Sequence, residues 1–326
     1  MLGSEMKRRE FLLLVGAAAG WPLTASAKAI PRVGYIDGSR NTPWVSDFLS
    51  ALADMGYVDG KNIIFIKRRF AAPTVQGMKD AISEIAPDID LLVVGGTVGG
   101  VAAKSAAAHI PVVFVSVGAP VDIGLVESLA HPGGNMTGTT FEATSETYAK
   151  RLQILKEIVP GLSRVAVLGA IDDPNFPFAM RSLMQSAPDL HVSITPIEFG
   201  SADGLGSAFK EMNTAHSEGL IVVSGSLTYS NNTAIAALAV AQGLPSCHGF
   251  REAVAEGGLI SLGPDLRIMA RQSARLVDKI LKGARAGDLP VEQPDRYVMS
   301  VNLKTARALG ISLPASIIAA AEEVIE

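Results

Sequence analysis

The sequence predicts an α/β protein with two lobes, each a parallel β-sheet covered by helices, and a ligand cleft between the lobes. The chain has 326 residues, which is more than one hydrophobic core usually supports. Its strand-like segments are apolar along their whole length, as expected of parallel strands that are buried on both faces. The order of predicted elements in the first half also returns in the second half.

The first 27 residues have the pattern of an export signal. A basic stretch at 7–9 precedes an apolar run at 11–20, and small residues at 25–27 suit cleavage by signal peptidase. The run is about half of the ~20 residues that a membrane-spanning helix needs, which disfavours an anchor. RREFL at 8–12 resembles the twin-arginine export motif. We expect residues 1–27 to be a cleaved twin-arginine signal peptide, with the general secretory route as the alternative.

Charge and cysteine content limit the partners of the mature chain. The full chain has a net charge of −4 at pH 7, and removing residues 1–27, with three basic and two acidic residues, leaves about −5. No basic stripe is visible, so we expect no nucleic-acid partner. Cys247 is the only cysteine, which excludes an internal disulfide and a lipid attached near the cleavage site. We therefore expect a monomer that is free in the periplasm.

Each half opens with a β-branched strand, which a turn-rich loop and an amphipathic helix follow. Two apolar strands follow in each half, and each ends in small or polar residues. The repeated order predicts a duplicated βαβ sheet. The matched segments are 32–36 with 164–168, 90–97 with 219–226, and 110–117 with 244–250.

Helices are expected to make the crossovers between these strands. In such sheets ligands bind beyond the carboxyl ends of the strands, where helix N-termini offer free N–H groups. The expected helices span 74–86, 98–108, 144–159, 203–216, 229–242 and 266–282.

The loops at the expected strand ends are rich in hydroxyls, amides and glycines, with a few aromatic residues nearby. This lining suits hydrogen bonding to a small organic molecule between apolar walls. The candidate ligand-binding residues are Tyr35, Asp37, Thr97, Val98, Gly99, Ser116 and Val117 in the first half, and Asp172, Asn175, Ser224, Ser226, Thr228, Tyr229 and Phe250 in the second.

Thr97 is the expected anchor for a ligand carboxylate. The glycines at 95–96 let the backbone turn, and a helix beginning near Val98 points its free N–H groups into the cleft. The Thr97 hydroxyl and the N–H groups of Val98 and Gly99 are then the donors. The alternative is that Thr97 only caps the helix.

Other motifs have structural explanations. GGTVGG at 95–100 lacks the spacing of nucleotide-binding loops, and the histidines lack metal-ligand spacing. Cys247 and His248 are neighbours on a strand, so their side chains point to opposite faces. Asp172 and Asp173 are either an acid–base pair or caps of the next helix. The sequence therefore predicts no catalytic residue, no metal and no cofactor.

Five segments of the chain carry a family resemblance: KRREFLLL at 7–14, GLVESLAHPGGNMTGTTFE at 124–142, KRLQILKEIVPGLSRVAVL at 150–168, REAVAEGGLISLGP at 251–264, and the closing segment at 301–326. Together they resemble the periplasmic substrate-binding components of ABC transporters, in the branch related to tryptophan- and tyrosine-binding proteins.

The resemblance implies a type I periplasmic binding protein, whose two lobes are joined by three crossing segments and close on the ligand. The implied lobes are 32–141 with 265–288, and 142–264 with 289–326. The implied function is to capture a small organic ligand, such as an amino acid or an aromatic carboxylate, and to deliver it to an ABC permease with its ATPase.

The ligand's ammonium group has no assigned partner. Ala119 stands where many family members carry an acidic residue that meets such a group, and Asp37 or Asp172 are the alternatives for that role. Two other functions also stay open. An exported ligand-sensing module needs a DNA-binding head or a membrane span, and an exported α/β enzyme needs a nucleophile, a metal set or a cofactor motif. The sequence shows none of these features, which favours transport.

Overall fold

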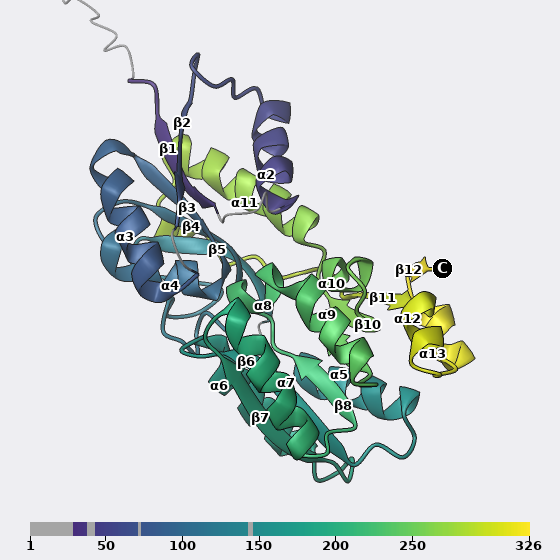
Figure 1. Ribbon diagram of the computed structural model, residues 1–326. Helices are drawn as coiled ribbons and strands as arrows, with labels where there is room; N and C mark the ends of the chain where they lie inside the picture. The colour runs from purple at the N-terminus through teal and green to yellow at the C-terminus, as the bar shows by residue number, and fades with distance from the viewer. Residues whose placement is uncertain (1–28, 38–42, 71–72, 143–145) are drawn as a thin grey trace, which may run out of the picture. The chain divides into compact units, whose positions relative to one another are not determined.

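A computed structural model describes residues 29–37, 43–70, 73–142 and 146–326 of the chain (Figure 1). The export signal expected at 1–27 lies outside these residues. Residues Pro31–Glu326 form one unit by their internal contacts. No helix in the described part of the chain is long and apolar enough to cross a membrane.

The first sheet has five parallel strands in the order β2-β1-β3-β4-β5. Alternate residues of its central strands enter two different cores, because successive side chains of a strand point to opposite faces. Leu91 and Val93 pack with Phe48 on one face, whereas Leu92 and Val94 lie on the other. The strands are β1 (Arg32–Asp37), β2 (Ile64–Arg69), β3 (Leu91–Gly95), β4 (Val112–Gly118) and β5 (Met136–Glu142).

Helices cover both faces of this sheet. The first core contains α2 and α11, and the second contains α3 and α4. A 3-10 helix, η1 (Ala86–Asp88), joins α3 to β3. The helices are α2 (Pro43–Asp54), α3 (Val75–Ile85), α4 (Gly96–Ala106) and α11 (Leu266–Leu281).

The second sheet has seven strands in the order β12-β11-β10-β9-β8-β6-β7. All neighbours are parallel except β10 and β11, which are antiparallel. The strands are β6 (Arg164–Ala170), β7 (Ser193–Phe199), β8 (Gly219–Val222), β9 (Ser246–His248), β10 (Ile260–Gly263), β11 (Val298–Asn302) and β12 (Glu323–Ile325).

Two cores also enclose the second sheet. One contains residues of α5, α6, α12 and α13, and the other contains residues of α7 and α9. The helices are α5 (Glu146–Ile158), α6 (Asn175–Ser186), η2 (Ala202–Gly204), α7 (Leu205–Thr214), α8 (Ser226–Ser230), α9 (Asn232–Ala241), α10 (Arg251–Ala255), α12 (Leu303–Ala308) and α13 (Ala315–Ala320).

The two sheets repeat one topology. The order β2-β1-β3-β4-β5 corresponds strand by strand to β7-β6-β8-β9-β10, which confirms the repeat that the sequence predicts. The antiparallel β11 and the short β12 extend only the second sheet. Two expected helices were wrong in detail: 229–242 is divided into α8 and α9, and the helix expected to begin near Val98 begins at Gly96.

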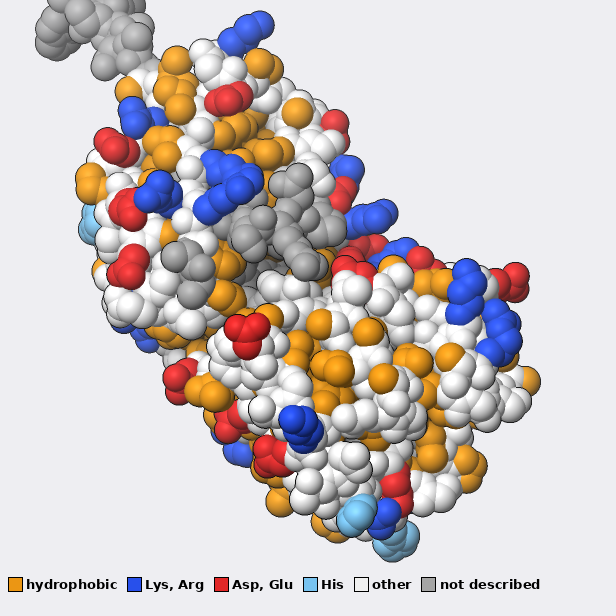
Figure 2. All heavy atoms as spheres, in the orientation of Figure 1, with side chains coloured by type: hydrophobic (Ala, Val, Ile, Leu, Met, Phe, Trp, Pro, Cys, Tyr) orange, Lys and Arg blue, Asp and Glu red, His pale blue; other side chains and the backbone are white. Residues whose placement is uncertain are grey.

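The chain passes between the sheets three times in this order. After β5 it enters α5; after β10 it returns to α11, which packs against α2 and β4 of the first sheet; and after η3 (Ala286–Asp288) it enters β11. Figure 1 shows α11 beside α2, although more than half of the chain separates them. On the face drawn in Figure 2, charged side chains of both signs are interspersed.

Candidate ligand-binding site

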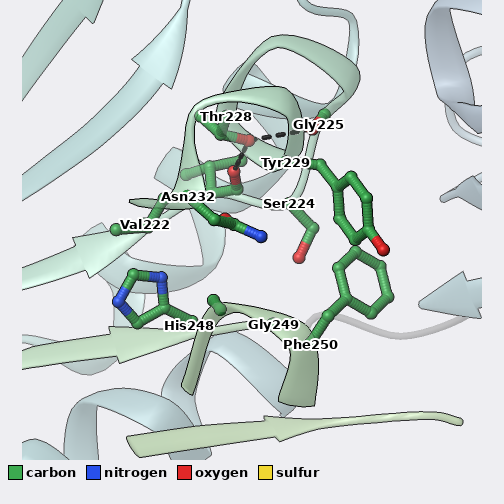
Figure 3. Close-up of a pocket in the computed structure, with 11 residues that line it drawn as sticks. Val222, Ser224, Gly225, Thr228, Tyr229, Asn232, His248, Gly249 and Phe250 are labelled. Carbon is green, nitrogen blue, oxygen red and sulfur yellow. Dashed lines mark hydrogen bonds between the residues drawn. The ribbon is translucent and has the colours of Figure 1, made fainter. Parts of the chain in front are cut away.

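A small pocket lies at the carboxyl ends of β8 and β9, where ligands bind in parallel α/β sheets (Figure 3). One side of the pocket is polar and another is aromatic. Both come from the segments that directly follow the two strands. The polar and aromatic lining residues are Ser224, Thr228, Tyr229, Asn232, His248 and Phe250.

Three polar side chains in the pocket are buried and lack a partner for one atom. Ser224 and Asn232 are each 4 % exposed, and His248 is 1 % exposed. Within the described residues, Ser224 Oγ, Asn232 Nδ2 and His248 Nδ1 have no hydrogen-bond partner. Figure 3 shows the Asn232 nitrogen and the Ser224 hydroxyl pointing toward each other, with the His248 ring beside them. Since buried polar groups are normally hydrogen-bonded, these atoms are suited to a partner from outside the chain.

His248 is neutral at physiological pH. Burial, followed by the positive charge of Arg151, lowers the pKa of His248 from 6.5 to about 4. Its Nε2 lies 3.0 Å from Ser246 Oγ, which fixes the ring and leaves Nδ1 facing the pocket. The neutral ring therefore offers the pocket one hydrogen-bonding atom and no charge.

Thr228 shapes the turn above the pocket. Its hydroxyl donates to the carbonyl oxygens of Val223 at 2.8 Å and Gly225 at 2.9 Å. These bonds hold the backbone between β8 and α8 in a tight turn. The turn directs Ser224 into the pocket and leaves the Thr228 hydroxyl hydrogen engaged with backbone.

The aromatic side of the pocket consists of Tyr229 and Phe250. Their ring centroids are 6.0 Å apart at an interplanar angle of 75°, an edge-to-face arrangement. Phe141 of β5 packs against Phe250 in the same way, at 5.5 Å, so this wall joins residues of both sheets. Burial first, and then the negative charges of Glu252 and Glu256, raise the pKa of Tyr229 above its ordinary value. The phenol is therefore protonated.

Loops from the two sheets meet beside the pocket. A Cβ atom at Gly96, in the first turn of α4, would lie 2.8 Å from Ser226 Oγ. A Cβ atom at Gly118, at the end of β4, would lie 2.5 Å from Asn175 Oδ1. The missing side chains of these two glycines allow the carboxyl ends of the two sheets to come into contact.

Asn175 begins α6 and is fully buried. Its Nδ2 donates to Tyr148 Oη and to the Ser224 carbonyl oxygen, each at 3.0 Å. Its Oδ1 faces Gly118 and has no partner among the described residues. Asn175 therefore joins the backbone of the pocket residue Ser224 to Tyr148 and packs against Gly118 at the end of β4.

Asp173 holds the start of the same helix. Its Oδ1 accepts from the Asn175 N–H at 2.9 Å, and its other oxygen occupies the space beside Gly225. Burial raises the pKa of Asp173 from 3.8 to about 6. Asp172, in contrast, is exposed and has a positive φ of 61°. Pro174 is the cap residue of α6, and Asp173 beside it accepts from the first N–H of the helix, so of the two roles considered for this pair the one at the helix start fits Asp173.

Thr97 does not cap α4, and its expected role as a donor to a ligand stays a prediction. Gly95 is the residue that caps α4, and the Thr97 hydroxyl accepts from the Gly118 N–H at 3.0 Å. Because the helix begins at Gly96, its free N–H groups belong to Gly96, Thr97 and Val98, whereas the N–H of Gly99 is paired within the helix. The expected donor role of the Gly99 N–H is therefore corrected.

Three other candidates of the first half, Tyr35, Ser116 and Val117, do not line the pocket. Tyr35 packs in the core edge-on to Phe65, with ring centroids 6.5 Å apart, and Val117 is fully buried in the other core of the sheet. Ser116 has a positive φ of 58° in an irregular part of β4, where its N–H donates to Thr139 Oγ1. Asp37 is the last residue of β1.

The pocket thus contains four of the predicted residues, namely Ser224, Thr228, Tyr229 and Phe250, with Asn175 and Ser226 next to it. Sequence reasoning missed Asn232 and His248. The position of His248 at a strand end was visible, but its buried, neutral state was not. The run NNT at 231–233 was the signal for Asn232, because these polar residues directly precede an apolar run at 234–241. No group of three or more His, Cys, Asp or Glu in the described residues is arranged to hold a metal ion.

The family model of the ABC transporter substrate binding protein matches residues 35–325. The chain belongs to this family. A relative of this substrate-binding protein, the tyrosine-binding protein of Clostridioides difficile (strain R20291), is 26% identical over 264 residues, which are 80% of this chain and 75% of the relative. The family binds substrates without converting them, so the protein is not an enzyme.

Solved structures share the fold of this substrate-binding protein. A conserved domain protein from Vibrio cholerae O1 biovar eltor str. N16961 has a TM-score of 0.81 and 25% identity, covering 90% of this chain and 99% of that one. The ABC domain in complex with L-Trp from Streptococcus pneumonia has a TM-score of 0.80 and 21% identity, covering 90% and 100%. The predicted type I periplasmic binding fold is thereby confirmed.

Proposed function

We propose that this substrate-binding protein is the periplasmic component of an ABC import system, and that it delivers a small organic ligand to a membrane permease with its ATPase. One observation carries the proposal. The pocket combines an aromatic side, Tyr229 and Phe250, with buried polar atoms that lack partners in the described residues, and it lies where loops of both sheets meet. A binding site without catalytic groups is what such a component requires.

The ligand is an aromatic amino acid or an aromatic carboxylate. The Tyr229 and Phe250 rings present an apolar surface to a planar group. The relative from Clostridioides difficile is a tyrosine-binding protein, and the Streptococcus structure holds L-Trp. Both names support an aromatic ligand for this chain.

The charged end of the ligand lies at the contact between the sheets. The start of α4, with the free N–H groups of Gly96, Thr97 and Val98, lies close to Ser226 of α8, and these groups suit a carboxylate. Asp173 is the acidic residue buried beside the pocket residue Gly225, and no lysine or arginine of the described residues forms an ion pair with it. We assign the ammonium of an amino acid ligand to Asp173, in preference to Asp37 or Asp172.

Ligand capture proceeds by closure of two lobes, 32–141 with 265–288 and 142–264 with 289–326. The packing of α11 against α2, and the place of β11 in the second sheet, support this division. A ligand that touches both lobes favours the closed form by its differential affinity. The protein acts as a monomer in the periplasm, after cleavage of residues 1–27.

Two measurements test this function. Native mass spectrometry of protein purified from a periplasm should show one bound molecule with the mass of an aromatic amino acid or aromatic carboxylate. Small-angle scattering should show a smaller radius of gyration once that compound saturates the protein. A compound that stabilises the protein but leaves the scattering profile unchanged would count against closure.

A further inference from the structure

We infer that the pocket at the ends of β8 and β9 recognises an uncharged hydroxyl group on the aromatic ring of the ligand, through Ser224, Asn232 and His248. The inference rests on the proposed function and narrows its ligand class to phenols. The three alternatives to a hydroxyl are an indole N–H, a carboxylate on the ring, and a ring without a polar substituent. The chemistry of the pocket distinguishes these four cases.

Asn232 requires a hydrogen-bond acceptor on the ligand. Its Nδ2 is a donor only, it is unpartnered among the described residues, and it points into the pocket (Figure 3). An indole N–H is also a donor only, so it cannot satisfy this atom. An unsubstituted ring leaves all three buried polar atoms without a partner, which costs binding energy. Both groups are therefore poor matches.

The charges around the pocket disfavour a carboxylate. The positive charge of Arg151 acts on His248. Arg151 already forms an ion pair with Glu142, however, in which both side chains are fully buried. Glu252 and Glu256 face Tyr229 from the segment after β9, and both are acidic. The described lining residues include no lysine or arginine. Arg151 Nη2 lies beside the lining residue Gly249, but Glu142 already balances its charge, so an additional buried anion would lack a countercharge of its own, which is costly.

A hydroxyl group satisfies the pocket. It can accept from Asn232 Nδ2 and at the same time donate to Ser224 Oγ or to the neutral His248 ring, because a hydroxyl is both donor and acceptor. The backbone of Gly249 packs against Ser224, since a Cβ there would collide with Ser224 Oγ, so the glycine keeps this hydroxyl in its place in the pocket. The Tyr229 and Phe250 rings then lie beside the ring that carries the hydroxyl.

Titration calorimetry with matched ligand pairs tests the inference. The pairs are L-tyrosine with L-phenylalanine, and 4-hydroxybenzoate with benzoate; terephthalate tests a carboxylate at the same ring position. In whichever of the two ligand pairs binds, we expect the wild-type protein to bind the hydroxylated compound about ten- to a hundredfold more tightly than the compound without the hydroxyl. Terephthalate should bind no more tightly than benzoate.

Two variants assign the effect to the pocket. Asn232→Leu should abolish the preference by weakening the hydroxylated ligand alone, and Ser224→Ala should reduce it. Asn213→Leu, the same substitution at an exposed position of α7, is the control and should keep the wild-type preference. Thermal unfolding checks that each variant is folded. If Asn232→Leu does not fold, the comparison of Ser224→Ala with the wild type is the test.

Three results would overturn the inference. Equal binding of both members of a pair, or a preference that survives in the folded pocket variants, means that the pocket holds only a buried water. Tighter binding of terephthalate means that it takes an anion. Binding of no compound in the set rejects the aromatic ligand class itself, and this outcome separates failure of the proposed function from failure of the hydroxyl assignment.

Discussion

Arg151 Nη1 lies 2.6 Å from Glu142 Oε1, and both side chains are fully buried. Glu142 ends β5 in the first sheet, and Arg151 lies on α5 after the first crossing between the sheets. Arg151 Nε also donates to the carbonyl oxygen of Leu262 at 2.9 Å, just before the second crossing. Tyr297, before β11, donates its hydroxyl to the Phe141 carbonyl oxygen at 3.0 Å. These neighbouring contacts therefore tie all three crossings together.

Removing one partner of this ion pair should be costly. Arg151→Met leaves the Glu142 carboxylate buried without a countercharge, and Glu142→Gln leaves the guanidinium in the same state, so each should lower the free energy of unfolding by about 3–5 kcal/mol. The double variant removes both charges and should recover most of this loss. Urea unfolding measures all four proteins. Additive losses in the double variant would show that the two charges act independently.

Gly118→Ala should weaken ligand binding through contact between the sheets. The new Cβ would lie 2.5 Å from Asn175 Oδ1 and 2.8 Å from Phe141 Cζ. Asn175 cannot easily move, because Tyr148 and Ser224 hold its amide. We expect affinity for L-tyrosine or the preferred aromatic ligand to fall by at least about tenfold, or 1.4 kcal/mol, in calorimetry. Gly206→Ala is the control, since nothing lies within 4 Å of its Cβ position.

Asp173→Asn should stabilise the protein at neutral pH. Burial raises the pKa of Asp173 from 3.8 to about 6, so the folded state holds a proton that the unfolded state releases between these values. The resulting cost is complete above about pH 6 and disappears as the pH falls to about 4, and it amounts to about 3 kcal/mol. Urea unfolding should show a gain of up to this size at pH 7 and little gain at about pH 4. Asp172→Asn, at the exposed neighbour, should change neither value by more than about 0.5 kcal/mol.

His248→Gln should make the protein less sensitive to acid. Burial, and then Arg151, lower the pKa of His248 from 6.5 to about 4, so the unfolded state takes up a proton first as the pH falls. Stability is therefore lost between these pH values, by about 3 kcal/mol from this group. In His248→Gln the fall in unfolding free energy over this window should be smaller by that amount. His109→Gln, at an exposed histidine, should follow the wild-type curve.

Export should depend on the arginine pair and not only on its charge. Replacing Arg8 and Arg9 with lysine keeps the charge but removes the motif that the twin-arginine receptor reads. We expect the precursor to remain in the cytoplasm, as measured by fractionation and immunoblotting. Normal accumulation of the Lys-Lys variant in the periplasm would indicate the general secretory route.

Local sequence patterns predicted most of the fold because burial acts on each strand separately. Leu91 to Val94 alternate between two cores, so a uniformly apolar run was a reliable signal of a strand covered on both sides. The antiparallel β11 was not predictable in this way. Its direction depends on the return of the chain after α11 and not on its own residues.

The site was less accessible to sequence reasoning, because its properties arise from contacts between distant segments. Ser224 and Phe250 could be placed at strand ends, whereas the isolation of the Asn232 amide and the neutral state of His248 depend on their burial in the folded chain. The contact between the Thr97 hydroxyl and the N–H of Gly118 on β4 was hidden for the same reason.

The position of α11 also determines when the first lobe can finish folding during synthesis. Val113 and Val115 of β4 share a core with Ala270 and Ala274 of α11. Helix α11 is synthesised only after most of the chain has left the ribosome. Until then, this face of the first sheet has no cover from α11, and its apolar strands are open to aggregation. A fragment ending at residue 264 therefore lacks part of the core of the lobe that is synthesised first.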